Sequence, residues 1–100
     1  MKFERPRGTR DFPPDDMLAR QLLSDALRGV FESYCYRRVE VPGFEHLELF
    51  TEKSGVEIIE SLYAFTDKSG RRLCLRPEAT ASVARMYASE LVHLRKPLKL

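Results

Sequence analysis

Apolar and polar residues recur along the chain with two different periods, and each period predicts one type of element. From residue 18 to residue 34, apolar side chains return every three or four positions, which is typical of one face of a helix. Pro14 suits the first helical position, and the two aspartates after it suit the positive end of the helix dipole. We therefore expect a helix from Pro14 with a buried apolar stripe. The stripe consists of Leu18, Leu22, Leu23, Ala26, Leu27, Val30, Phe31 and Tyr34.

A period of two follows this helix and predicts strands. Residues 37–41 alternate and are rich in β-branched side chains, so we expect a strand that ends at Pro42-Gly43. Residues 44–50 fit either a strand or irregular structure, and residues 56–62 fit a short helix. Residues 63–66 and 72–75 flank the polar loop 67–70, which ends in glycine, and this arrangement predicts a β-hairpin.

The remaining segments complete an α+β pattern. Prolines in residues 5–14 predict an extended arm before the first helix. A second helix is expected from about residue 80 to residue 91, and residues 96–100 begin another extended segment. A helix followed by antiparallel strands mixed with further helices predicts an α+β fold, an antiparallel sheet flanked by helices.

Composition and charge exclude several classes of protein. With 43% hydrophobic and 32% charged residues in 100 positions, the chain resembles one globular domain and not a disordered segment. Seventeen cations and fifteen anions leave a formal charge of only +2, which is too small to indicate nucleic-acid binding by itself. No apolar run approaches the ~20 residues of a membrane span, and the first residues show no signal peptide, so we expect no membrane partner.

The residues that most often carry chemistry are isolated. Cys35 and Cys74 lie far apart without a partner pattern, so neither a disulfide framework nor a zinc site is expected. A reduced, cytoplasmic setting follows, with both cysteines as small core residues. His46 and His93 predict surface or partly packed side chains. The chain has no phosphate-binding loop, metal-binding helix or nucleophile elbow, so we expect no metal site and no catalytic residue within it.

The stretch Leu75–Thr80 raises a sharper question, because a strand pattern there ends in a cation, a proline and a carboxylate. Glu78 lies at the start of the second helix, whose dipole favours an ionised carboxylate. Together with the hydroxyl of Thr80 it would form an acceptor site for an ammonium group. The spacing fits a helix cap as well, and caps are commoner. Arg76 can equally serve to pair with a nearby carboxylate.

Charged residues near the N-terminus leave the same choice open. Arg7, Arg10 and Asp11 surround Gly8 and Thr9, and they can either line a site or form a solvated arm.

Three segments, in this order and spacing, resemble histidyl-tRNA synthetase, a class II aminoacyl-tRNA synthetase. They are RGTRDF at 7–12, YRRVEVPGFEHLELF at 36–50 and LYAFTDKSGRRLCLRPEAT at 62–80. The resemblance covers nearly the whole chain and implies the N-terminal portion of a class II synthetase catalytic domain.

The resemblance also implies roles for particular residues. The family's motif 1 builds a homodimer interface, and it corresponds here to the apolar helix and to Val39, Val41 and Pro42. The family's Arg-Pro-Glu-x-Thr element binds histidine, with its Glu and Thr on the α-ammonium group. It corresponds to Glu78 and Thr80, with Ala79 between them where many relatives carry glycine.

The implied activity is the ATP-dependent attachment of histidine to tRNA(His) through a histidyl-adenylate, with ATP and Mg²⁺ as cofactors. In the family, motif 2, motif 3, a Gly/Arg/Tyr element and the anticodon-binding domain lie beyond residue 100, so we expect residues 1–100 alone to be inactive. Two alternatives stay open. One is the regulatory subunit of ATP phosphoribosyltransferase, a paralogue that keeps the amino-acid pocket, and the other is a non-catalytic dimerisation module.

Overall fold

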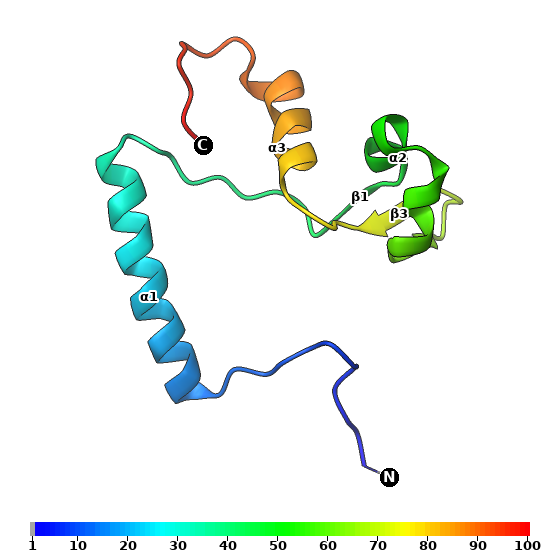
Figure 1. Cartoon of the computed structure of the whole chain (residues 1–100), viewed down its shortest axis with the longest axis horizontal. Helices are drawn as coiled ribbons and strands as arrows, with labels where there is room; N and C mark the ends of the chain where they lie inside the picture. The colour runs from blue at the N-terminus through cyan, green and yellow to red at the C-terminus, as the bar shows by residue number, and fades with distance from the viewer. Residues whose placement is uncertain (1) are drawn as a thin grey trace. The chain divides into compact units, whose positions relative to one another are not determined.

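The computed structural model describes residues 2–100, except for the side chains of residues 53, 54 and 56. It contains both helices and a small antiparallel sheet, which confirms the α+β prediction. The elements, in chain order, are α1 (Pro14–Ser33), β1 (Phe44–His46), α2 (Glu48–Ser54), the 3₁₀ helix η1 (Val56–Ser61), β2 (Ala64–Thr66), β3 (Arg72–Leu75), α3 (Thr80–Met86) and the π-helical turn η2 (Tyr87–Leu91) (Figure 1).

The chain forms two compact units. One comprises the residues up to 37 together with residues 99 and 100, and the other comprises residues 38–98. No helix in residues 2–100 combines the length and the apolar character that crossing a membrane requires.

Helix α1 of the first unit begins at Pro14, as the sequence predicts, with Asp15 and Asp16 in its first turn. A polar network covers one of its faces: Asp25 accepts hydrogen bonds from Gln21 (2.8 Å) and Arg28 (3.0 Å). The prediction of a buried apolar stripe is wrong, since α1 contains no buried residue and Leu22 and Leu23 are 63% and 62% exposed. Periodicity shows that a helix has an apolar face, but it does not show that a described segment covers that face.

The end of α1 explains a second wrong prediction, because Cys35 is exposed and not a core residue. Cys35 has a φ of 67°, in the left-handed region that glycine usually occupies after a helix. Its N–H donates to the carbonyl of Glu32 (2.9 Å), and the N–H of Tyr36 donates to the carbonyl of Phe31 (3.0 Å). These two hydrogen bonds define a Schellman motif, and the rings of Phe31 and Tyr36 pack edge to face across it.

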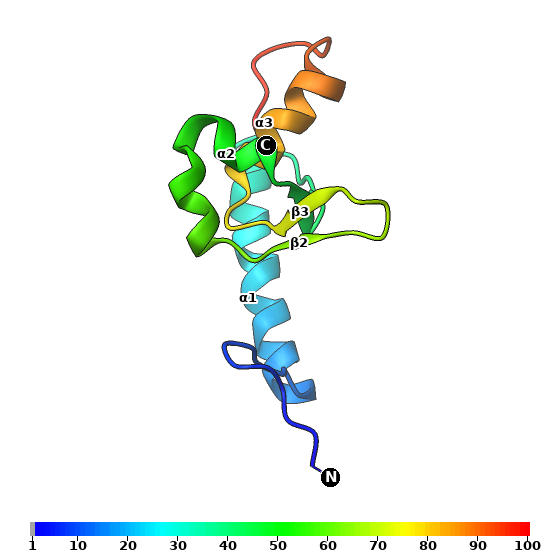
Figure 2. The same ribbon diagram turned by 90° about the vertical axis from the view of Figure 1, so that its right-hand side faces the viewer.

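The sheet of the second unit has the strand order β1-β3-β2, and both pairs are antiparallel. The predicted hairpin is present: β2 and β3 flank a loop that Figure 2 shows pointing away from α2. Gly70 has a φ of 83°, and its N–H donates to the carbonyl of Asp67 (3.1 Å), so the loop is a turn followed by a left-handed residue. The expected helix over 80–91 is present as α3 and η2.

The predicted strand at residues 37–41 is absent, and the neighbouring residues 44–46 form β1 instead. The reason lies in the pairing partner, because the ladder of β1 and β3 ends at the pair Phe44 and Leu75, next to Arg76 and Pro77. A proline has no N–H to extend the ladder. Residues 37–41 have strand-like side chains but no strand beside them.

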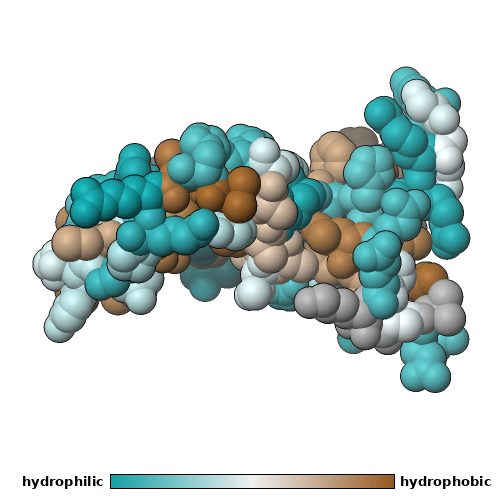
Figure 3. Space-filling view, turned by 90° about the horizontal axis from the view of Figure 1, so that it is seen from above, coloured by the Kyte–Doolittle hydropathy of each residue, from teal (hydrophilic) through white to brown (hydrophobic). Residues whose placement is uncertain are grey.

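The core of the second unit lies on one face of the sheet. Leu47, Phe50 and Cys74 are buried together, and Ala81 of α3 packs against them. On the opposite face, the rings of Phe44 and Phe65 meet edge to face and are 53% and 43% exposed. Apolar side chains also reach the surface in the space-filling view, where brown patches lie between teal ones (Figure 3).

Candidate functional site

The candidate site lies where β3 ends and α3 begins. Arg76 is the first residue after β3, and its backbone N–H donates to the carbonyl of Gly43 (3.1 Å). Its guanidinium donates to the carbonyl of Val41 (3.1 Å). Arg76 therefore binds the irregular segment before β1 and not a carboxylate, the partner that the sequence suggested.

Glu78 caps the start of α3. One carboxylate oxygen accepts a hydrogen bond from the backbone N–H of Ala81 (3.1 Å), and the other accepts one from the backbone N–H of Thr80. The hydrogen bond from Ala81 is the main cause that lowers the pKa of Glu78 below its ordinary value of 4.5, desolvation opposes it, and the backbone and side chain of Thr80 lower it further. The Glu78 carboxylate is consequently ionised at neutral pH.

Capping does not use all the acceptor capacity of Glu78. A carboxylate has about four lone-pair positions, and the two N–H groups of α3 together with the Thr80 side chain account for three of them. Glu78, Ala79 and Thr80 are all exposed. Ala79 has a φ of −98°, so its backbone does not require glycine. The turn thus presents an ionised carboxylate and a nearby hydroxyl to the surface.

An ion pair behind this turn was not predicted from the sequence. Glu45 of β1 is only 7% exposed, and Arg85 of α3 donates to its Oε1 from Nε (3.2 Å) and Nη2 (2.9 Å). Burial and the negative charge of Glu45 raise the pKa of Cys74, the Cα partner of Glu45 in the sheet. No local sequence pattern could predict this ion pair, because Glu45 and Arg85 are 40 positions apart. Glu45 and Cys74 lie on one face of the sheet because they are cross-strand partners.

The other predicted site residues lie apart from this turn in sequence. Val39 and Val41 are half-buried and Pro42 is exposed, all in the irregular segment before β1. Their part in a dimer interface stays a prediction. The described side chains include no group of three or more His, Cys, Asp or Glu residues that could hold a metal ion.

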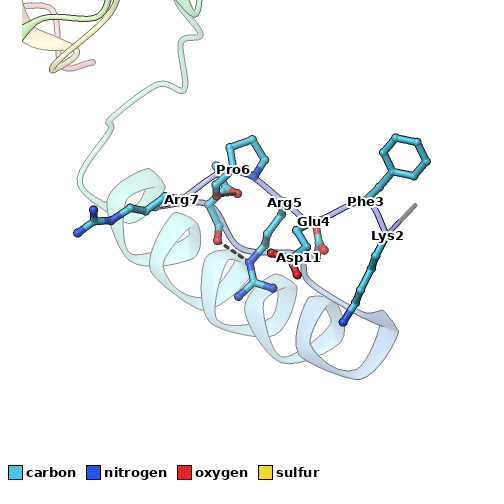
Figure 4. Close-up of a pocket in the computed structure, with 9 residues that line it drawn as sticks. Lys2, Phe3, Glu4, Arg5, Pro6, Arg7 and Asp11 are labelled. Atoms are coloured by element: carbon cyan, nitrogen blue, oxygen red, sulfur yellow. Dashed lines mark hydrogen bonds between the residues drawn. The ribbon is translucent and has the colours of Figure 1, made fainter.

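The N-terminal arm surrounds a hollow of about 520 Å³ (Figure 4). Arg5 donates to the carbonyl of Thr9 (2.8 Å), and the guanidinium of Arg7 points away from that of Arg5. Arg10 pairs with Asp16 at 3.5 Å and lies over the ring of Phe12. Every arm residue is exposed, so these charges form a solvated arm and do not converge on one point.

Comparisons with known proteins agree with each other. The family model for histidyl-tRNA synthetase matches residues 8–100. A histidine–tRNA ligase of Archaeoglobus fulgidus is 57% identical over 99 residues, and one of Methanocaldococcus jannaschii is 49% identical over 98 residues. These alignments cover 99% and 98% of this chain, but only 24% of each relative. The chain therefore spans about a quarter of the length of these curated relatives.

Solved structures show the same likeness. The apo histidyl-tRNA synthetase of S. aureus superposes with a TM-score of 0.80 at 30% identity, over 97% of this chain and 23% of that one. A protein of Bacillus halodurans described as an ATP phosphoribosyltransferase regulatory subunit/histidyl-tRNA synthetase gives a TM-score of 0.77 at 28% identity, over 98% and 26%. The fold, the Arg-Pro-Glu-x-Thr turn and these matches lead to one conclusion: the chain belongs to the histidyl-tRNA synthetase family.

Proposed function

We propose that this chain is the N-terminal part of a class II catalytic domain that attaches histidine to tRNA(His), and that Glu78 and Thr80 bind the α-ammonium group of histidine. One observation carries the assignment of the site: Glu78 is ionised and exposed at the β3–α3 turn, with acceptor positions left after capping. An ammonium group has three donors and no acceptor, which suits a carboxylate beside a hydroxyl.

Capping and ligand binding are compatible in this geometry, and the cap improves the site. The two backbone N–H groups hold the Glu78 carboxylate in one orientation before any ligand arrives. They also keep it charged, because they stabilise the ionised form. A histidine ammonium would therefore meet a carboxylate that does not need to reorganise.

The rest of the reaction is assigned to residues outside this chain. ATP and Mg²⁺ would provide the activated phosphate and offset its charge, but the described residues contain no cluster that fits a metal ion. We assign to residues 1–100 the histidine ammonium site and, through α1 with Val39, Val41 and Pro42, a contact between two subunits of a cytoplasmic homodimer.

The test measures histidine-dependent pyrophosphate exchange in the full-length enzyme that this proposal assigns to the chain. Glu78→Ala removes the charge, so we expect the KM for histidine to rise about 10- to 100-fold, as the loss of a charge-assisted hydrogen bond implies. The KM for ATP should stay within about twofold. Glu78→Gln keeps the size and one acceptor oxygen, and it separates the loss of charge from the loss of the cap.

Glu60, an exposed glutamate at the end of η1, offers a matched control. Glu60→Gln should leave both KM values unchanged. Residues 1–100 alone should show no exchange. Unchanged histidine kinetics in Glu78→Ala would leave Glu78 as a cap only, and turnover by the isolated chain would contradict the division of roles.

A second candidate is a regulatory subunit of ATP phosphoribosyltransferase, because the Bacillus halodurans structure carries that description beside the synthetase name. A regulatory subunit would bind histidine without charging tRNA. Charging of tRNA(His) by the full-length protein supports the synthetase, whereas histidine binding without exchange or charging supports the regulatory subunit.

A further inference from the structure

Packing and an ion pair both hold α3 against the rest of its unit. Within the part of the chain that the structure describes, Ala81 packs against the core cluster of Leu47, Phe50 and Cys74, and Ser82 is completely buried. The ion pair between Arg85 and Glu45 adds a polar contact with β1. Glu78 and Thr80 stand at the start of this same helix, so whatever holds α3 also decides where they lie.

The geometry of the ion pair restricts how α3 is oriented relative to β1. Glu45 is held in β1 opposite Cys74, which is fully buried, and its carboxylate is almost completely enclosed. Arg85 reaches it with two N–H groups, at 3.2 and 2.9 Å, on a single oxygen. A planar guanidinium with two charge-assisted hydrogen bonds restricts the angle as well as the distance between the helix and the strand.

Arg85 lies on the same stripe of α3 as Ser82, which stands three positions before it. It is five positions after Thr80, the first residue of α3, which corresponds to about 7.5 Å along the helix axis. Ser82 is completely buried, so this stripe of α3 faces packed atoms next to Arg85. The guanidinium of Arg85 is engaged by Glu45, away from the exposed carboxylate of Glu78 in sequence.

From this geometry we infer that Glu45 and Arg85 are positioning residues, which orient α3 so that Glu78 and Thr80 meet the α-ammonium group of histidine. The inference rests on the proposed function of the β3–α3 turn and adds to it two residues that do not contact the substrate. Without the pair, α3 keeps the packing of Ala81 and Ser82 but loses the two hydrogen bonds that fix its angle to β1. The carboxylate of Glu78 then points away from its productive direction part of the time.

The experiment uses the same full-length enzyme and the same exchange assay. Arg85→Met keeps the length and apolar stem of the side chain but removes both N–H donors. We expect it to raise the KM for histidine about tenfold while the KM for ATP stays within about twofold, since a small displacement of one binding group has effects of this size. Arg85→Lys keeps a charged donor toward Glu45 but lacks the planar pair of N–H groups, so its KM for histidine should lie between those of the wild type and of Arg85→Met.

Arg71 provides the matched control, because it also pairs with a carboxylate, Asp67, but in the exposed hairpin loop. Arg71→Met should leave both KM values unchanged. If Arg85→Met does not fold, Glu45→Gln is measured instead. It removes the negative charge and keeps an amide oxygen that accepts from Arg85, so the KM for histidine should rise about threefold while the KM for ATP does not change. A parallel rise of both KM values, a fall in kcat alone, or no difference from Arg71→Met would overturn the inference. A wild-type enzyme that does not activate histidine would refute the proposed function instead.

Discussion

At the scale of single residues, Cys35 is held in a backbone conformation that its side chain disfavours. The left-handed region brings Cβ close to the following carbonyl, and glycine avoids this cost of about 1–2 kcal/mol. The Schellman hydrogen bonds and the packing of Phe31 on Tyr36 hold the residue there nonetheless. The end of α1 therefore contains strain that one substitution can remove.

Cys35→Gly should increase the free energy of unfolding by up to about 1 kcal/mol, because relief of strain exceeds the added flexibility of the unfolded chain. Denaturant unfolding followed by far-UV circular dichroism would measure this change. Cys35→Ala keeps the Cβ atom and is the matched control, with no gain expected. The interpretation would be wrong if Cys35→Gly were less stable than Cys35→Ala.

At the scale of elements, the hairpin depends on one carboxylate. Asp67 accepts hydrogen bonds from the backbone N–H groups of Ser69 (2.9 Å) and Arg71 (2.8 Å) and from the guanidinium of Arg71 (2.6 Å). The backbone hydrogen bond from Arg71 is the largest cause that lowers the pKa of Asp67 below its ordinary value of 3.8. Desolvation opposes this change, and the other two contacts add to it.

A carboxyl group whose pKa falls on folding stabilises the folded loop above its unfolded pKa, and this contribution is lost as the pH falls through the folded value. The ordered hairpin loop should therefore loosen only below pH 3.8. Amide exchange at Ser69 and Arg71, followed by NMR as the pH is lowered, would detect the loosening. In Asp67→Asn this transition should be missing, and loosening of the wild-type loop well above that pH would contradict the assignment.

Local patterns predicted the elements whose causes are local. Pro14 and the spacing of the leucines were enough for the start of α1, and Asp67 to Gly70 were enough for the hairpin loop. Residues 37–41 have the same alternation as a strand, yet pairing depends on what β3 offers beside them, which their own sequence does not contain. Glu78 could be placed at a helix start, whereas the ion pair between Glu45 and Arg85 depends on residues 40 positions apart.

At the scale of the whole molecule, two apolar surfaces stay uncovered in the described chain. One is the stripe of α1, on which Leu18, Leu22 and Leu23 are each more than 60% exposed, and the other is the sheet face around Phe44 and Phe65. Contiguous apolar surface of this kind marks interaction sites or causes association. The relatives have roughly four times as much chain with which to cover such surfaces, since this chain spans 24% of them.

The purified 100-residue chain should therefore self-associate in the micromolar range. Light scattering coupled to size-exclusion chromatography would show species larger than 11.6 kDa. Replacing Leu22 and Leu27 by lysine should shift the population toward monomer, because it places charge on the stripe, while Arg28→Lys on the polar face should not. A wild-type chain that elutes as a monomer would show that these surfaces do not drive self-association.

The two hydrogen bonds of Arg76 connect the segment before β1 with the β3–α3 turn. Its backbone holds Gly43 and its guanidinium holds Val41, while two residues further on Glu78 starts α3. Arg76 therefore joins two proposed functional segments: the one that meets a second subunit and the turn that receives the substrate. Loss of the Arg76 side chain removes the hydrogen bond to Val41 and leaves the backbone hydrogen bond to Gly43, so a variant at Arg76 should weaken the pairing of subunits more than the use of histidine.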